Sequence, residues 1–169
     1  MRQLERMDAP DIFHAIDSQR EYLGRWLPFV ALTRSLSDTE IFVESVLNAP
    51  EELLELTFTI RVKGEFAGLV GFKDTDRLNR KTEIGYWLSE RFQKQGIMTR
   101  CVEKLCEHAF NMLDINRIQI KCAVGNHASS NIPKRLGFRL EGIERQGELL
   151  TDTGFADLEV YSRLSSDQH

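Results

Sequence analysis

Residues 82–122 carry, in order, a strand, a glycine-containing loop, an amphipathic helix and a second strand. After Gly96 the apolar residues recur at i, i+3, i+4, i+7, i+8 and i+11, which predicts a helix over 97–113. Residues 82–88 and 117–122 have strand composition, and 117–122 alternate between apolar and polar side chains. Such a unit predicts two parallel strands joined by a crossover, with the helix N-terminus at the carboxyl edge of a sheet.

The rest of the chain predicts antiparallel strands and more helices. Residues 54–62 alternate strictly, and the turn Lys63-Gly64 leads into 66–72, which is typical of a hairpin. Asp8 precedes one predicted helix, and Ser37 with Glu40 forms a capping-box pattern in another. The remaining predicted elements are strands at 2–5, 138–150 and 155–164, the last two around a turn at 151–154, and helices at 8–20, 37–49 and near 130–136. We expect an α/β (α+β) fold: a mixed, mostly antiparallel sheet with a central parallel strand pair, flanked by helices.

Composition narrows the class of protein. The chain has 169 residues, of which 41% are hydrophobic and 28% charged, with a net charge of −4, and these values suit a single domain over residues 1–169. The charge gives no footprint for nucleic acid, and no apolar run is long enough for a membrane span, so we expect a cytoplasmic protein without direct nucleic-acid or membrane partners. Three cysteines without a CxxC spacing or a histidine cluster predict neither a disulfide framework nor a metal site.

The loop before the 97–113 helix reads RFQKQGIMTR, from Arg91 to Arg100. A helix N-terminus carries unpaired N–H groups and a partial positive charge that attract phosphate, and glycine lets the backbone approach closely. Arg91, Lys94 and Arg100 add positive charge. A single glycine before a helix is nevertheless more often a turn than a ligand site, so these residues alone leave both interpretations open.

Two motifs resemble a known family. TEIGYWLSERFQKQGIMTR, over 82–100, is similar to the acetyl-CoA-binding motif of the GNAT family of N-acetyltransferases, with its Q/R-x-x-G-x-G/A loop. Its GYWL and GIMT stretches resemble the RimJ/RimL branch, which acetylates the N-termini of ribosomal proteins. Downstream, NHASSNIPKRLGF and RLEGIERQGEL, over 126–149, continue the resemblance. Met98 replaces the last small residue of the loop, and Pro133 stands where many members of the family carry a tyrosine as general acid.

The resemblance implies a cofactor site. In the family the loop backbone holds the pyrophosphate of acetyl-CoA, and the preceding strand pairs with the pantetheine arm and polarises the thioester carbonyl. The rings of Tyr86 and Trp87 themselves are better explained as core aromatics. The positions of this chain that match the family's cofactor-binding residues are Trp87, Leu88, Gln93, Gln95, Gly96, Met98, Thr99 and Asn126.

The resemblance also implies an acid and a base. Glu148 matches the general base of the branch and Ser129 its general acid, with Glu83 as the reserve base. Two structural alternatives remain: Ser129 caps a helix that begins near Ser130, and Glu148 is a solvated glutamate on an outer strand. Pro133 fits the first turn of such a helix, where its missing N–H costs nothing.

A covalent route through Cys122 is disfavoured, because a buried cysteine is the commoner finding and only Lys121, on the opposite strand face, is near enough in sequence to lower its pKa. The expected acceptor is the α-amine of a ribosomal protein. Acetylation of a small amine, such as a polyamine or an aminoglycoside, is the alternative among enzymes, and a catalytically silent acyl-CoA-binding module is the alternative outside them. The branch also suggests a homodimer. Segment 18–37 and the turn at 151–154 are expected to form the acceptor groove, with Arg20, Arg25, Arg34, Tyr22 and Trp26 as candidate contacts. The same residues are equally compatible with a solvated helix face on which Trp26 and Leu27 pack inward.

Overall fold

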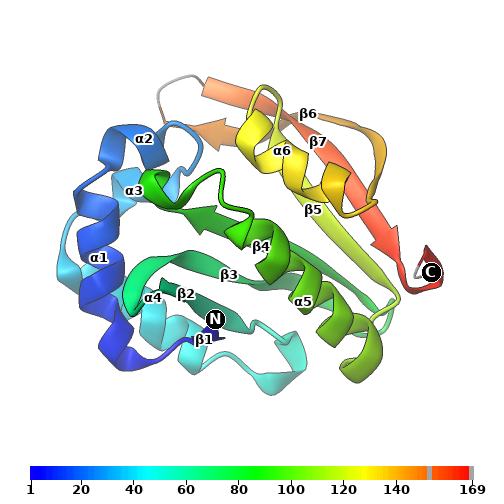
Figure 1. Cartoon of the computed structure of the whole chain (residues 1–169), viewed down its shortest axis with the longest axis horizontal. Helices are drawn as coiled ribbons and strands as arrows, with labels where there is room; N and C mark the ends of the chain where they lie inside the picture. Colours follow the sequence, from blue (N-terminus) through cyan, green and yellow to red (C-terminus); the bar gives the residue numbers. More distant parts are fainter. Residues whose placement is uncertain (152–153, 168–169) are drawn as a thin grey trace.

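One seven-stranded sheet organises the computed structural model, which describes residues 1–151 and 154–167. The strand order is β1-β2-β3-β4-β5-β7-β6, and of the strand pairs only β4 and β5 run parallel (Figure 1). The predicted mixed sheet with a central parallel pair is therefore confirmed. The strands are β1 (Arg2–Gln3), β2 (Thr57–Val62), β3 (Glu65–Asp76), β4 (Lys81–Leu88), β5 (Arg117–Ala123), β6 (Arg139–Leu150) and β7 (Gly154–Leu164).

Helices cover both faces of this sheet. The α-helices are α1 (Ala9–Asp17), α2 (Arg20–Gly24), α3 (Phe29–Leu32), α4 (Leu36–Leu47), α5 (Ile97–Met112) and α6 (His127–Arg135). One apolar core lies between the sheet and α5 with α6, and includes Val102 and Leu105 of α5. A second core lies between the other face of the sheet and the four helices α1 to α4, and it includes Ile12 of α1 and Trp87 of β4. No helix in the described part of the chain is both long and apolar enough to cross a membrane.

The parallel strands separate soon after they meet. β4 pairs with β5 only from Lys81 to Glu83, although β4 continues to Leu88. Beyond this point β5 keeps its pairing with β7 as far as Ala123. The middle of the sheet therefore opens towards the carboxyl ends of both strands, next to the start of α5 (Figure 1).

Several helix starts differ from the sequence-based expectation. α6 begins at His127, because the side chain of Asn126 caps it by accepting a hydrogen bond from the Ser129 N–H at 3.2 Å. The expectation that Ser129 caps this helix is wrong, and Pro133 lies inside the helix instead of in its first turn. At α4 the capping box consists of Ser35 and Asp38, so the predicted pair two residues later is also wrong.

The expected cap at Asp8 has another role. Its side chain makes no capping bond to α1 and is fully buried, where it accepts hydrogen bonds from Arg2 at 2.6 Å and Arg61 at 2.9 Å. This cluster ties the N-terminal segment to β2. The short helices α2 and α3 lie between the helices predicted at 8–20 and 37–49, and neither was predicted as a separate element. The predicted turn at 151–154 includes residues 152 and 153, which lie outside the described residues.

Candidate active site

A large open cavity of about 1050 Å³ occupies the opening between β4 and β5. Its walls come from β3, β4, the first turn of α5, the end of β5, α6, β6 and the segment that contains α1 to α4. The predicted site residues that line it are Glu83, Trp87, Leu88, Gln93, Gly96, Met98, Thr99, Asn126, Ser129 and Glu148. Gln95 does not line it, and its side chain donates to the Arg91 carbonyl at 3.2 Å instead.

Gly96 is the N-cap of α5 and adopts a left-handed conformation with φ of 69°. A side chain is strained there, so the chain requires glycine for its backbone geometry. The helix that follows presents Ile97, Met98 and Thr99 to the cavity. The two interpretations of this glycine, a turn and a ligand site, are therefore compatible, because the turn exposes the first N–H groups of the helix.

Basic side chains surround the same loop, but they differ in availability. Arg91 is paired with Glu65 at 2.5 Å, and Arg100 donates to the Gln95 carbonyl at 3.3 Å. Lys94 lines the cavity, and so does Arg135 at the end of α6. The sequence reasoning missed Arg135. Its signal was the i, i+3, i+7 spacing of Ala128, Asn131 and Arg135, which places all three on the cavity side of one helix.

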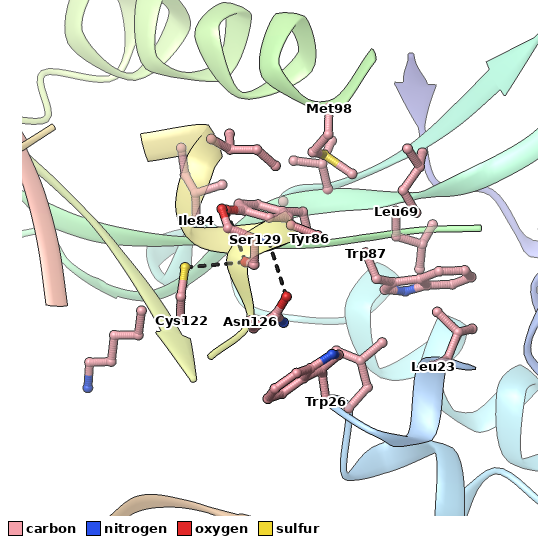
Figure 2. Close-up of a pocket in the computed structure, with 18 of the residues that line it drawn as sticks. Leu23, Trp26, Leu69, Ile84, Tyr86, Trp87, Met98, Cys122, Asn126 and Ser129 are labelled. Carbon is pink, nitrogen blue, oxygen red and sulfur yellow. Dashed lines mark hydrogen bonds between the residues drawn. The ribbon is translucent and has the colours of Figure 1, made fainter. Parts of the chain in front are cut away.

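The aromatic residues of β4 behave as two different groups. The ring of Trp87 is buried and packs with Phe66, with ring centroids 5.8 Å apart, so its assignment as a core aromatic is confirmed. Tyr86 also packs against the core, but its hydroxyl reaches the cavity wall formed by α6. Figure 2 shows the two side chains of this strand directed to different parts of the cavity.

Ser129 lies at the centre of a polar cluster (Figure 2). Its hydroxyl donates to the Tyr86 hydroxyl at 3.3 Å, and the Cys122 sulfur is 3.2 Å from the same oxygen. The Tyr86 hydroxyl in turn donates to the Ser129 carbonyl at 3.0 Å. With Asn126 accepting from the Ser129 N–H, the backbone and the hydroxyl of Ser129 are both held in place.

The two carboxylates predicted as bases, Glu148 and Glu83, differ in their partners. Glu83 is buried, forms an ion pair with Lys73 at 2.9 Å and accepts a hydrogen bond from Gln119 at 3.2 Å. The Glu148 carboxylate makes no ion pair or hydrogen bond with any described residue, whereas the backbone of Glu148 pairs with Ala156 of β7. Burial raises the pKa of Glu148 above its usual 4.5, and nearby Glu83 adds to this, while Lys73 and Lys121 oppose it. A half-buried carboxylate without a fixed partner is well suited to accept a proton.

Cys122 has the environment of an inert thiol. It is buried, and burial raises the pKa of its thiol above 9.0. Cys122 does line the cavity, so the raised pKa of its thiol is what disfavours a covalent intermediate at this residue.

Some of the candidate acceptor contacts in segment 18–37 line the cavity, and others hold the segment itself in place. Trp26 lines the cavity beside Leu23, with the Arg25 guanidinium 5.1 Å from its ring (Figure 2). Tyr22 also lines it and accepts a hydrogen bond from the side chain of Gln93, which lies in the cofactor loop. Arg20, by contrast, donates to two backbone carbonyls of segment 30–33 at 3.0 and 2.7 Å, and so holds that segment in place.

Comparison with known proteins agrees with this geometry. The acetyltransferase (GNAT) domain model matches residues 1–139. YdaF of Bacillus subtilis, to which a ribosomal N-acetyltransferase activity is ascribed, is 35% identical over 99% of this chain and 91% of its own length. The ribosomal-protein-serine acetyltransferase of Escherichia coli is 31% identical over 93% of this chain and 87% of its own.

A solved structure of RimL, a ribosomal L7/L12 alpha-N-protein acetyltransferase in complex with coenzyme A, superposes with a TM-score of 0.91 at 29% identity. The match covers 96% of this chain and 92% of that one. The family's co-substrate fits the site, because β4 runs on to Leu88 beyond its last residue paired with β5 and the cavity opens beside the α5 N-terminus. The chain therefore belongs to the GNAT family and is an acetyl-CoA-dependent N-acetyltransferase.

Proposed function

We propose that this enzyme acetylates the α-amine at the N-terminus of a ribosomal protein, one that begins with serine or alanine after removal of methionine. The observation that carries the proposal is Glu148, a half-buried carboxylate with no partner among the described residues, in the same cavity as Ser129. A protein α-amine has a pKa of about 8, whereas that of lysine is about 10.4. A weak carboxylate base is therefore sufficient for an α-amine.

The roles of the cavity residues follow from their positions. The first turn of α5, with Gly96, Met98 and Thr99, binds the pyrophosphate through backbone N–H groups, and Gln93 and Gln95 belong to the same loop. Lys94 and Arg135 supply positive charge for the phosphates. The unpaired end of β4, at Trp87 and Leu88, receives the pantetheine arm together with Asn126.

Proton transfer falls to two side chains. Glu148 accepts the proton of the attacking amine, directly or through one water, as the new C–N bond forms. Ser129 donates its hydroxyl proton to the sulfur as the C–S bond breaks. Glu83 is less suited to the base role, since its carboxylate is already bonded to Lys73 and Gln119. The whole of residues 1–169 acts as one catalytic unit in this proposal.

The proposal includes a cytoplasmic location, where ribosomal proteins are made, and a homodimer without direct nucleic-acid contacts. The β6–β7 hairpin supports the dimer, because it exposes the apolar side chains Ile143, Leu149 and Phe155. Sedimentation of the purified protein tests the dimer directly, and a monomer at micromolar concentration would contradict it.

The decisive experiment uses labelled acetyl-CoA and dissociated ribosomes. Mass spectrometry should locate the label on the N-terminal residue of one ribosomal protein, and Glu148→Gln should slow the labelling about a hundredfold without loss of coenzyme A binding. Label only on lysine side chains, or only on added spermidine or an aminoglycoside, would contradict the ribosomal acceptor but keep the acetyltransferase. If cofactor is bound but no amine in a broad panel is acetylated, the alternative is a silent acyl-CoA-binding module.

A further inference from the structure

Helix α6 contains a proline at a position where other residues donate a hydrogen bond. Pro133 is the seventh residue of α6, His127–Arg135. In an α-helix the N–H of this residue would bond to the carbonyl four positions earlier, which belongs to Ser129. Proline has no N–H to give. The Ser129 carbonyl is therefore left available to a donor from outside the helix.

Tyr86 of β4 provides that donor. Its hydroxyl donates to the Ser129 carbonyl at 3.0 Å, and Figure 2 shows its ring extending from the strand to α6. Burial raises the pKa of the Tyr86 phenol well above its usual 10.0. The phenol therefore stays protonated at neutral pH and remains a donor.

This bond fixes the direction of the next one. A phenol has one proton, and Tyr86 uses it on the carbonyl, so its oxygen can only accept from the Ser129 side chain. The Ser129 hydroxyl accordingly donates to Tyr86, at 3.3 Å. Asn126 holds the Ser129 N–H, and Cys122 contacts the hydroxyl oxygen from another side at 3.2 Å. Ser129 is thus presented as a donor in a fixed position.

We propose that Tyr86 is a positioning residue for Ser129, and that Pro133 enables this by leaving the Ser129 carbonyl free for the phenol. The inference rests on the proposed role of Ser129 as the acid. A distance of 3.3 Å is long for an O–H···O bond, so the serine readily exchanges it for a stronger bond to a charged thiolate. The Oγ–H bond then breaks as the S–H bond forms, and the serine oxygen regains a proton through water as Glu148 releases the proton it took from the amine.

Kinetics test the positioning role in the full-length protein. Tyr86→Phe removes only the hydroxyl and should lower kcat about tenfold, because misplaced catalytic groups cost up to about a hundredfold. The KM for acetyl-CoA and the calorimetric Kd for coenzyme A should not change. In a Ser129→Ala background, Tyr86→Phe should cause no further loss of kcat. Tyr161→Phe is the matched control, since this buried tyrosine donates to Glu159 at 3.0 Å and does not line the cavity, and its kcat should equal that of the parent.

Thermal unfolding tests the role of Pro133. In the parent protein, Tyr86→Phe leaves the Ser129 carbonyl without its phenol donor and should lower the Tm. In a Pro133→Ala background the new N–H bonds to that carbonyl, so Tyr86→Phe should lower the Tm by clearly less. Comparing the four proteins cancels any loss that Pro133→Ala causes alone.

Two results would overturn the inference. Either Tyr86→Phe lowers kcat as much in the Ser129→Ala background as in the parent, or its effect on the Tm is the same with and without Pro133. A parent protein that acetylates no amine would instead remove the proposed function, which the Tm comparison does not depend on. The two failures are therefore distinguishable.

Discussion

Glu148 is the carboxylate whose chemistry depends most on its surroundings. Because burial raises its pKa above 4.5, the rate should fall on the acid side at a pKa higher than that of an ordinary glutamate. We expect Glu148→Gln to lower kcat/KM about a hundredfold and to remove this acid-side step, while the step near pH 8 from the amine remains. A pH profile of kcat/KM for both proteins checks this. Glu103→Gln, at an exposed residue of α5 that does not line the cavity, should keep nearly full activity.

The same pKa shift has a consequence for stability. A pKa that is higher in the folded than in the unfolded state means that the ionised carboxylate costs folding free energy above that pKa, and nothing below the unfolded value. At neutral pH Glu148→Gln removes this cost, so its Tm should equal or exceed that of the parent. A lowered Tm would show that Glu148→Gln loses activity because the variant unfolds.

Gly96 combines a backbone requirement with a binding role. Gly96→Ala imposes a left-handed conformation on a residue with a Cβ, at a cost of about 1 kcal/mol, and the Cβ would lie 3.1 Å from the Arg100 guanidinium. We expect the Kd for coenzyme A to rise about tenfold if this shifts the first turn of α5. Gly64→Ala is the matched control, because its φ is also positive, at 87°, but no atom lies within 4 Å of the new Cβ. Equal Kd values for Gly96→Ala and the parent, measured by calorimetry, would contradict a phosphate site here.

At the scale of elements, one ion pair joins three strands. Glu141 is the extra residue of a bulge in β6, where it accepts two hydrogen bonds from Arg117 of β5, at 2.6 and 2.5 Å, and one from Ser162 of β7 at 2.7 Å. The hydrogen bonds from Arg117 and, to a smaller extent, from Ser162 together lower the pKa of Glu141 to about 2, although burial opposes them. The bulge is what turns this side chain across β7.

The lowered pKa sets the pH range in which this pair stabilises the fold. Its contribution is complete above the ordinary pKa of 4.5 and is lost as the pH falls towards about 2. Since both side chains are partly exposed, Glu141→Gln should cost about 1 kcal/mol at pH 7 and nothing at pH 2. Urea unfolding at both pH values measures this. Glu107→Gln, an exposed α5 residue without a partner among the described residues, should match the parent at both.

The sequence predicted those elements that have a clear period. The alternation in 117–122 and the helical spacing after Gly96 yielded β5 and α5 within a residue, because both have one buried face. Cap positions could not be fixed in the same way: Ser35 and Ser37 are both good caps, and only the packing of α4 selects between them. The helices of segment 18–37 are too short for a period to be visible.

The candidate site was likewise predictable in part. The residues of the cofactor loop and of Asn126–Ser129 follow from motifs that are continuous in sequence, and the cavity brings them together. The role of Tyr86 was hidden, because its bond to Ser129 joins residues 43 positions apart and depends on where α6 starts. Arg135 was missed for the same reason. Contacts between elements depend on their exact ends, which are the least predictable feature of a sequence.

At the scale of the whole molecule, the cofactor should stabilise the fold by filling the opening between β4 and β5. Coenzyme A at 100 times its Kd should add about 2.7 kcal/mol to the free energy of unfolding, since it binds only the folded state. The Tm should rise with the logarithm of its concentration. Gly96→Glu, which blocks the α5 N-terminus, should show no such rise while Gly64→Glu still does, and equal shifts in all proteins would contradict binding in this cavity.

The early separation of β4 from β5 also bears on how the molecule opens. Only the register from Lys81 to Glu83 pairs the two strands, so the β1–β4 side and the β5–β7 side of the sheet share few backbone hydrogen bonds. Contiguous units that share few such bonds open separately, with free energies below that of global unfolding. We expect two groups of protected amides in hydrogen exchange without cofactor and one merged group with it. The substrate would then serve as the element that makes the two halves unfold together.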